Sequence, residues 1–312
     1  MMRIAPQKIM CAIDFSEFTH LILSYGKSLA QEYGAALTLC HVIPEAPIVS
    51  SHMTPYIVYA GIESERVALA RERLDSMARE IDFKCEIAIA TGHPADEIDR
   101  LARENDADMV IAATYGGSGF KRFLIGSVTS RLVKILSSPL LVLQAKETLP
   151  KEPVLEKLKL EKILVGCDFS SDSTLAFDYA LSLAQEFQTQ LHLAHVMRPA
   201  MPVDLSESDY AQLQSRDAEM VPEPGDSLTS HLKRQLSEMV PEDSRNWCTP
   251  VTVLLQGQPY QELLDYAARE SVDMIVLGIR GHSLLEQFLV GSTTDRVISR
   301  APCPVLAVRH NH

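Results

Sequence analysis

The nine residues Lys8-Ile-Met-Cys-Ala-Ile-Asp14-Phe-Ser16 recur 154 positions later as Lys162-Ile-Leu-Val-Gly-Cys-Asp168-Phe-Ser170. In both places an apolar run of strand length ends in an aspartate followed by Phe-Ser. The same offset relates Ser28-Leu-Ala-Gln-Glu-Tyr33 to Ser182-Leu-Ala-Gln-Glu-Phe187. A repeat of this length indicates two copies of one domain, and a chain of 312 residues is long enough for two.

The repeat continues to the end of each copy, but its offset changes from 154 to 165. Gly116 then corresponds to Gly281, and Gly126-Ser127 to Gly291-Ser292. The change predicts 11 additional residues in the second copy, and the Pro-rich, acidic stretch Met201–Asp226 is the expected place for them. We expect the first domain to cover residues 1–146, a charged linker 147–159, and the second domain 160–312.

Within each copy, apolar runs of strand length alternate with segments of helical period. Strands that are apolar on both faces and separated by helices imply a parallel sheet covered on both sides, and right-handed crossovers make it doubly wound. The expected strands of the first copy are Lys8–Ile13, Ala36–Ile43, Lys84–Ala90, Asp108–Ala113 and Leu140–Gln144. The expected helices lie near Phe18–Glu32, Glu63–Arg79, Ala95–Asn105 and Val128–Leu136.

In such a sheet, ligands bind at the carboxyl ends of the strands, so we looked first at the segments after strands one and four. After strand four the second copy has Gly278-Ile-Arg280-Gly281, then nine residues, then Gly291-Ser292-Thr293. Glycines let backbone N–H groups approach phosphate oxygens, and a helix that begins at Ser292 favours an anion. The alternative is a turn that needs glycine for its geometry alone.

This pattern resembles the ATP-binding signature of the universal stress protein family. The first copy has Ala113-Thr-Tyr-Gly116, nine residues, then Gly126-Ser127, so only its first glycine is replaced. Pro139-Leu-Leu-Val and Pro302-Cys-Pro-Val follow at matching places and strengthen the resemblance. It covers nearly the whole chain.

The resemblance implies two tandem, doubly wound, five-stranded α/β sheets of Rossmann-like, adenine-nucleotide-binding type with strand order 3-2-1-4-5. It implies ATP, with Mg²⁺, as the ligand. It also implies that the acidic residue after strand one faces the adenosine end, beside a hydrophobic residue that ends strand two: Asp14 with Val42, and Asp168 with Val196. The alternative for each aspartate is a helix N-cap, and the two roles are compatible.

The two copies differ where Ala113 replaces Gly278. If this position needs a positive φ, the methyl group costs on the order of 1 kcal/mol; if it needs close approach, the methyl group blocks a phosphate oxygen. The first copy offers Lys121 and Arg122 instead, and the second copy Arg280. We predict tighter ATP binding by the second copy.

Composition argues against several classes of function. A net charge of −12 disfavours nucleic acids and acidic lipid surfaces, and no signal peptide or membrane span is recognisable. The six cysteines are scattered, without metal-ligand spacing, as in a reduced cytoplasmic protein. His41 and His195 occupy equivalent positions, but the repeat gives them no shared ligand partner, so we expect them to be structural.

We find no Walker-type lysine loop and no nucleophile–base pair in the repeated positions, so no catalytic residue is predicted. The leading hypothesis is a nucleotide-responsive stress-response binding protein with at most slow ATP hydrolysis. A genuine slow ATPase or phosphotransferase and a nucleotide-independent scaffold stay open. The family resemblance further implies pairing through the last strands, Leu140–Gln144 and Val305–Arg309, as an intramolecular pseudo-dimer or between two chains. The sequence identifies no protein partner.

Overall fold

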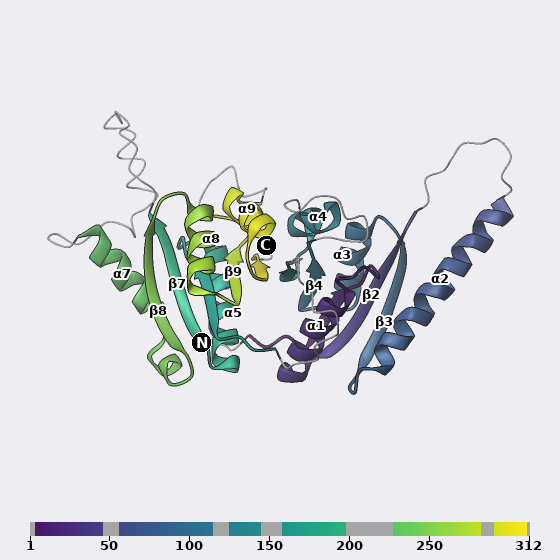
Figure 1. The fold of residues 1–312 in the computed structure, drawn as a ribbon, viewed down its shortest axis with the longest axis horizontal. Coiled ribbons are helices and arrows are strands. Elements are labelled where there is room, and N and C mark those ends of the chain that lie inside the picture. Colours follow the sequence, from purple (N-terminus) through teal and green to yellow (C-terminus); the bar gives the residue numbers. More distant parts are fainter. Residues whose placement is uncertain are drawn as a thin grey trace, which may run out of the picture.

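The computed structural model describes residues 4–45, 56–114, 125–144, 158–197, 227–281 and 290–310. Its described strands form a single ten-stranded sheet, with the second copy on the left and the first on the right in Figure 1. The predicted linker 147–159 lies largely outside the described residues, and the predicted insertion at 201–226 lies wholly outside them.

The elements follow the alternation of apolar runs and amphipathic segments in the sequence. The first copy consists of β1 (Lys8–Ala12), α1 (Thr19–Tyr33), β2 (Ala36–Pro44), α2 (Tyr56–Arg79), β3 (Cys85–Gly92), α3 (Pro94–Glu104), β4 (Met109–Ala113), α4 (Ser127–Ile135) and β5 (Leu140–Leu143). The second consists of β6 (Lys162–Gly166), α5 (Ser171–Phe187), β7 (Gln190–Met197), α7 (Leu228–Glu238), the 3₁₀ turn η2 (Glu242–Asn246), β8 (Thr249–Gln256), α8 (Pro259–Glu270), β9 (Met274–Gly278), α9 (Ser292–Arg300) and β10 (Val305–Val308).

The strand order confirms the predicted fold. The sheet runs β3-β2-β1-β4-β5-β10-β9-β6-β7-β8, so each copy has the order 3-2-1-4-5, and the pairs within each copy are parallel. One boundary differs clearly: α2 begins at Tyr56, seven residues before the expected Glu63. The sequence of residues 56–62, YIVYAGI, has no polar positions, so it gives no amphipathic signal of a helix.

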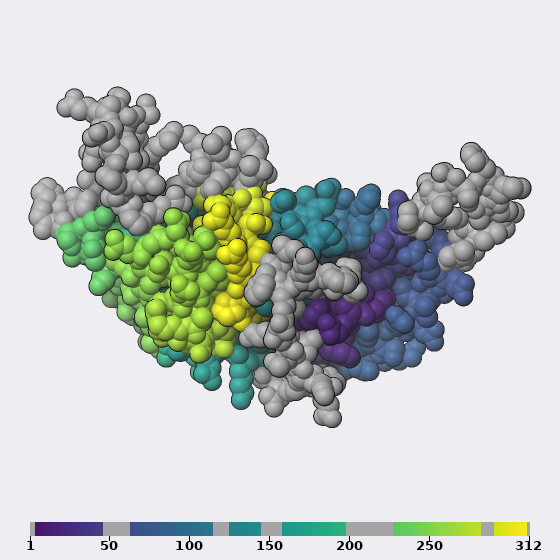
Figure 2. All heavy atoms as spheres, turned by 45° about the horizontal axis from the view of Figure 1, so that its top comes forward, coloured from purple at the N-terminus to yellow at the C-terminus, as the bar shows by residue number. Residues whose placement is uncertain are grey.

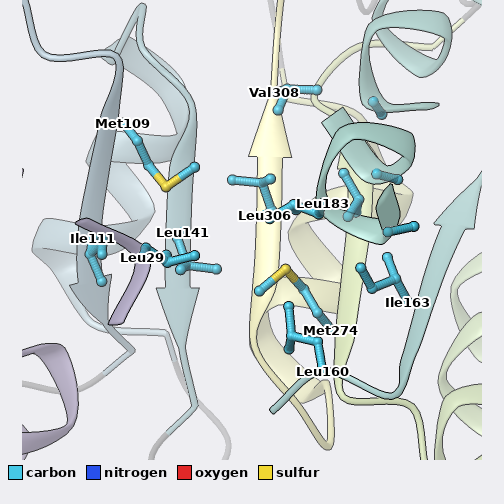
Figure 3. Packing of buried hydrophobic residues seen from close by; sticks show 14 of the residues in the cluster. Leu29, Met109, Ile111, Leu141, Leu160, Ile163, Leu183, Met274, Leu306 and Val308 are labelled. Atoms are coloured by element: carbon cyan, nitrogen blue, oxygen red, sulfur yellow. The ribbon is translucent and has the colours of Figure 1, made fainter. Parts of the chain in front are cut away.

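The two copies join where β5 and β10 pair in antiparallel register, Leu141 opposite Leu306 and Val142 opposite Val305. Figure 3 shows Leu141 and Leu306 on these neighbouring strands, with Met109 and Met274 on the strands beyond them. The last strands therefore pair within one chain, as the pseudo-dimer hypothesis expects.

Each face of the sheet carries a hydrophobic core that continues from one copy into the other. Helices α1, α2, α5 and α7 cover one face, and α3, α4, α8 and α9 cover the other. Figure 2 shows the yellow C-terminal elements lying directly against the teal elements of the first copy. The helical residues Leu29, Leu74, Phe177 and Leu236 belong to one core, and Ile98, Leu132, Leu263 and Val297 to the other.

A second pair of contacts crosses between the copies. The Ile4 N–H donates to Ser182 Oγ of α5 at 3.0 Å, and the Leu158 N–H donates to Ser28 Oγ of α1 at 3.4 Å. Both pairs are equivalent by the repeat, because Ile4 and Leu158 lie 154 positions apart, as do Ser28 and Ser182. The residues before the first strand of each copy therefore lie on the first helix of the other.

Candidate functional site

The turn after strand one is built by the predicted aspartate. Asp168 Oδ1 accepts the Ser170 N–H at 3.0 Å and the Ser170 hydroxyl at 2.6 Å, and Phe169 between them has a φ of 64°. In the first copy, Asp14 Oδ1 accepts the Ser16 N–H at 3.0 Å. The N-cap of α5 is Ser170, whose hydroxyl accepts the Ser173 N–H, so at this site the alternative role of the aspartate as a cap is wrong.

A histidine of strand two supports each turn. His195 Nδ1 lies 2.8 Å from the Cys167 carbonyl oxygen, and His41 Nδ1 lies 2.7 Å from that of Ile13. A carbonyl can only accept, so Nδ1 carries the proton in both rings. The His195 ring centroid lies 5.1 Å from that of Phe169, and burial lowers the pKa of His195. Both histidines therefore have the structural role that the sequence predicted.

The loop after strand four is closed at its base by the same two bonds in both copies. The Gly291 N–H donates to the Ile279 carbonyl at 2.8 Å, and the Thr294 hydroxyl donates to the Gly278 carbonyl at 2.7 Å. The first-copy equivalents are Gly126 to Thr114 at 2.6 Å and Thr129 to Ala113 at 2.7 Å. Sequence reasoning missed the two threonines, although each lies three positions after the repeated glycine.

Helices α4 and α9 begin at this base without a described side chain as a cap. The preceding glycines, Gly126 and Gly291, have φ of −61° and −59°, so neither needs the conformational freedom of glycine. Because these glycines have no side chain, the first-turn N–H groups beside them stay accessible to a ligand. These are the N–H groups of Ser127 in the first copy and of Ser292 and Thr293 in the second. Such N–H groups have no partner within the helix and favour an anion.

Gly278 does not need a positive φ, and the structure adds a reason for it that the sequence did not suggest. Its φ is not in the left-handed region. A Cβ at this position would lie 2.6 Å from the Asp172 carbonyl carbon and 2.8 Å from the Ser173 nitrogen, in the first turn of α5. In the first copy α1 begins at Thr19, two positions later than α5 by the repeat, so that turn has no helical counterpart beside Ala113.

Asp172 fastens the second-copy loop to its surroundings. Its side chain is buried, at 2% exposed, and Oδ2 accepts the Arg280 N–H at 3.0 Å while Oδ1 accepts the His310 N–H at 2.9 Å. The Arg280 carbonyl oxygen also lies 3.4 Å from the Ser170 hydroxyl oxygen. The structure thus brings Asp168, Gly278 and Arg280 together. The first copy has the buried Phe18 at the position equivalent to Asp172. Because Asp172 is not repeated, the comparison of the two copies did not identify it.

The remaining predicted residues lie at the same edge of the sheet. Val196 and Val42 stand near the ends of β7 and β2, next to Leu255 and Ala90 in the register. Gly281 is described, whereas Gly116, Lys121 and Arg122 lie outside the described residues, as do 282–289. A hollow of ≈ 660 Å³ lies at the opposite edge, near Gln190 and Thr249 at the starts of β7 and β8, away from these groups.

The described residues contain no group of three or more His, Cys, Asp or Glu side chains that could hold a metal ion. Among the helices that the structure describes, none is long and apolar enough to cross a membrane. All six cysteines are free thiols, and all but the half-buried Cys85 are buried.

Comparison with known proteins gives matches over both copies. A sequence model described as "Universal stress protein family" matches residues 6–144 and 159–309. Universal stress protein Rv2005c of Mycobacterium tuberculosis is 26% identical over 313 residues, covering 97% of each chain. Universal stress protein MJ0531 of Methanocaldococcus jannaschii is 31% identical over 150 residues, 48% of this chain and 82% of its own. The crystal structure of a universal stress protein from Archaeoglobus fulgidus aligns with a TM-score of 0.66 at 19% identity, covering 98% of this chain and 99% of its own.

Proposed function

The chain belongs to the universal stress protein family, and from that premise we propose that it is a cytoplasmic, ATP-binding regulator of the stress response. One observation carries the proposal. In both copies a helix start without a described side-chain cap is held against the end of strand four by a glycine N–H and a threonine hydroxyl. The same arrangement is therefore built twice, at the edge where doubly wound sheets bind ligands, and it supports the binding of an anion there.

The proposed ligand is ATP with Mg²⁺. The first-turn N–H groups of α9, at Ser292 and Thr293, would take the terminal phosphates, with Ser127 of α4 as the counterpart in the first copy. The turn at Asp168 and the apolar side chain of Val196 would meet the adenosine end, with Asp14 and Val42 as counterparts. The sequence has no Walker-type lysine loop and no nucleophile–base pair in its repeated positions, so we propose binding with at most slow hydrolysis.

Regulation would follow if ATP binds the ordered form of the loop more tightly than other forms, because a ligand shifts conformations only through differential affinity. The protein would then present one surface to a partner with nucleotide bound and another without it. An ATPase assay bears on the alternative: steady phosphate release that Gly291→Val abolishes would favour a genuine enzyme over a regulator.

The first test is isothermal titration of the full chain with ATP and Mg²⁺. We expect Gly281→Val to remove the tighter site and Gly116→Val the weaker one. The base of the second-copy loop has more support than that of the first, because Asp172 accepts the Arg280 N–H and Gly278 admits the first turn of α5. If only Gly116→Val abolished binding, the ranking of the copies would be reversed. If wild-type chain neither bound ATP nor carried nucleotide when purified, the scaffold hypothesis would replace ours.

A further inference from the structure

The residue after the last strand of each copy reaches across the β5–β10 junction to the other copy. Gln144 Nε2 donates to the Ile298 carbonyl of α9 at 3.0 Å. Arg309 donates to the Val133 carbonyl and, at 3.0 Å, to the Lys134 carbonyl of α4. Gln144 and Arg309 are equivalent by the repeat, since they lie 165 positions apart, and so are Val133 and Ile298. We call this reciprocal pair of contacts the clasp.

Each helix held by the clasp begins at the base of the loop that follows strand four in its copy. Helices α4 and α9 have nine residues each, with the loop base at one end and the carbonyl gripped by the clasp in the last turn. Val133 and Ile298 are fully buried, at 1% and 0% exposed. Each clasp residue therefore bonds to a part of the helix that is packed in the core. A short, well-packed helix moves as a unit, so its two ends are not independent.

The clasp residue is also joined to the loop of its own copy. The Ile279 N–H donates to the Val308 carbonyl at 2.8 Å, directly before Arg309, and the Thr114 N–H donates to the Leu143 carbonyl at 2.9 Å, directly before Gln144. A continuous chain of bonded groups therefore runs from the loop base of one copy, through its last strand and clasp residue, to the helix that follows the loop of the other copy.

We propose that the clasp couples the two nucleotide sites, so that filling one raises the affinity of the other. This inference rests on the proposed function. ATP held at the start of α9 would restrain that helix and, through the Ile298 carbonyl, Gln144 and the Thr114 N–H, the base of the first-copy loop, so that less conformational freedom remains to be lost when the first copy binds. Linkage requires the same coupling factor in both directions.

Calorimetry with ATP and Mg²⁺ tests the coupling in the full chain. The affinity of each site in wild type is compared with its affinity when the other site is disabled by Gly281→Val or Gly116→Val. We expect ATP bound at one site to raise the affinity of the other site about fivefold or more, which is the lower end of typical allosteric coupling. In the double variant Arg309→Met, Gln144→Leu, which keeps side-chain size but removes the donors, both sites should still bind and the factor should fall to about one.

Two results overturn the coupling while leaving ATP binding intact: independent sites in wild type, or a factor that persists in the double variant. A chain that binds no ATP at all overturns the proposed function instead, and the two failures are therefore distinct. Arg309→Gln, which copies the first-copy residue, is the conservative control and should retain the coupling.

Hydrogen exchange provides a readout that needs no ligand. Arg309→Met should speed exchange at Gly126 and Ser130, at the start of α4, and leave Gly291 and Asp295 of α9 unchanged. Gln144→Leu should do the reverse. Faster exchange at both helix starts in either variant, or at neither, contradicts transmission by the clasp.

Discussion

Gly278 and Ala113 occupy one position of the repeat, yet only one of them tolerates a side chain. At Gly278 a Cβ would meet backbone atoms of Asp172 and Ser173 at 2.6–2.8 Å, and backbone cannot rotate away as a side chain can. We expect Gly278→Ala to lower the free energy of unfolding by about 1–3 kcal/mol, the usual range for overpacking. Ala113→Gly is the matched control and should change it by less than about 1 kcal/mol. Urea denaturation measures both, and equal effects would contradict the close approach.

His195 gives the protein a predictable pH dependence. Burial lowers the pKa of His195 below the 6.5 of an exposed imidazole. Above pH 6.5 the ring is neutral in both the folded and unfolded states, so its contribution to stability is complete. As the pH falls below 6.5, His195 is protonated in the unfolded chain but stays neutral in the folded chain. The free energy of unfolding therefore decreases until the pH reaches the lower pKa of His195 in the folded state.

The variant His195→Asn keeps a donor for the Cys167 carbonyl but does not titrate. We expect the variant to lose less stability than wild type between pH 7.5 and 5.5, as measured by urea unfolding at both values. Other titrating groups are common to the two proteins and cancel in the comparison. The same loss in both would show that the His195 ring is not kept neutral.

Single residues were predictable from the sequence only where the repeat or a family motif marked them. Asp168 and Gly278 were found this way, although their contacts were not: Asp168 bends the chain onto Ser170, and Gly278 makes room for α5. Asp172 was missed because the first copy has Phe18 there. Its two bonds are made to N–H groups more than 100 positions away, which no local pattern indicates.

At the scale of elements, the threonine in the first turn of α4 and α9 joins the helix to the preceding strand. In Thr294→Val the shape is kept, but the Gly278 carbonyl loses its 2.7 Å hydroxyl bond. We expect a loss of about 1–3 kcal/mol in the free energy of unfolding, the range for a buried acceptor left unpaired, and weaker ATP binding at the second site. Thr129→Val should lower the intrinsic affinity of the first site and not that of the second, and calorimetry on both variants tests this. Weakening of the same site by both would contradict it.

Strands and helices were largely predictable, because apolar runs and amphipathic periods report directly which faces are buried. Nine elements of the first copy were expected and all nine are present. The start of α2 was missed because an apolar stretch such as residues 56–62 has no periodicity. The start of α1 was expected near Phe18 and lies at Thr19, but nothing in the sequence indicated that α5 starts two positions earlier in the repeat. Asp-Phe-Ser precedes both helices, and only the second has a described side-chain cap, Ser170.

At the scale of the molecule, the pairing of β5 with β10 followed from the family resemblance, but the contacts across it did not. The repeat tells which residues are equivalent, not which equivalent residues are adjacent. Ile4 on Ser182 and Leu158 on Ser28 depend on how the copies are placed relative to each other, and so does the clasp. These contacts make the two copies mutually dependent.

That dependence predicts how the chain unfolds. Because both cores continue through the junction, we expect one calorimetric transition for the whole chain rather than one per copy. Leu306, 0% exposed and opposite Leu141, lies at the centre of the junction, so Leu306→Ala should remove about 2–5 kcal/mol and shift the entire transition to lower temperature. Leu236→Ala, in α7 and remote from the junction, should shift the same single transition, whereas Leu69→Ala, at a side chain 52% exposed, should leave it in place. The opposite result would be two transitions, of which Leu236→Ala shifts only one. It would mean that the two copies unfold independently and that the β5–β10 junction does not couple their stabilities.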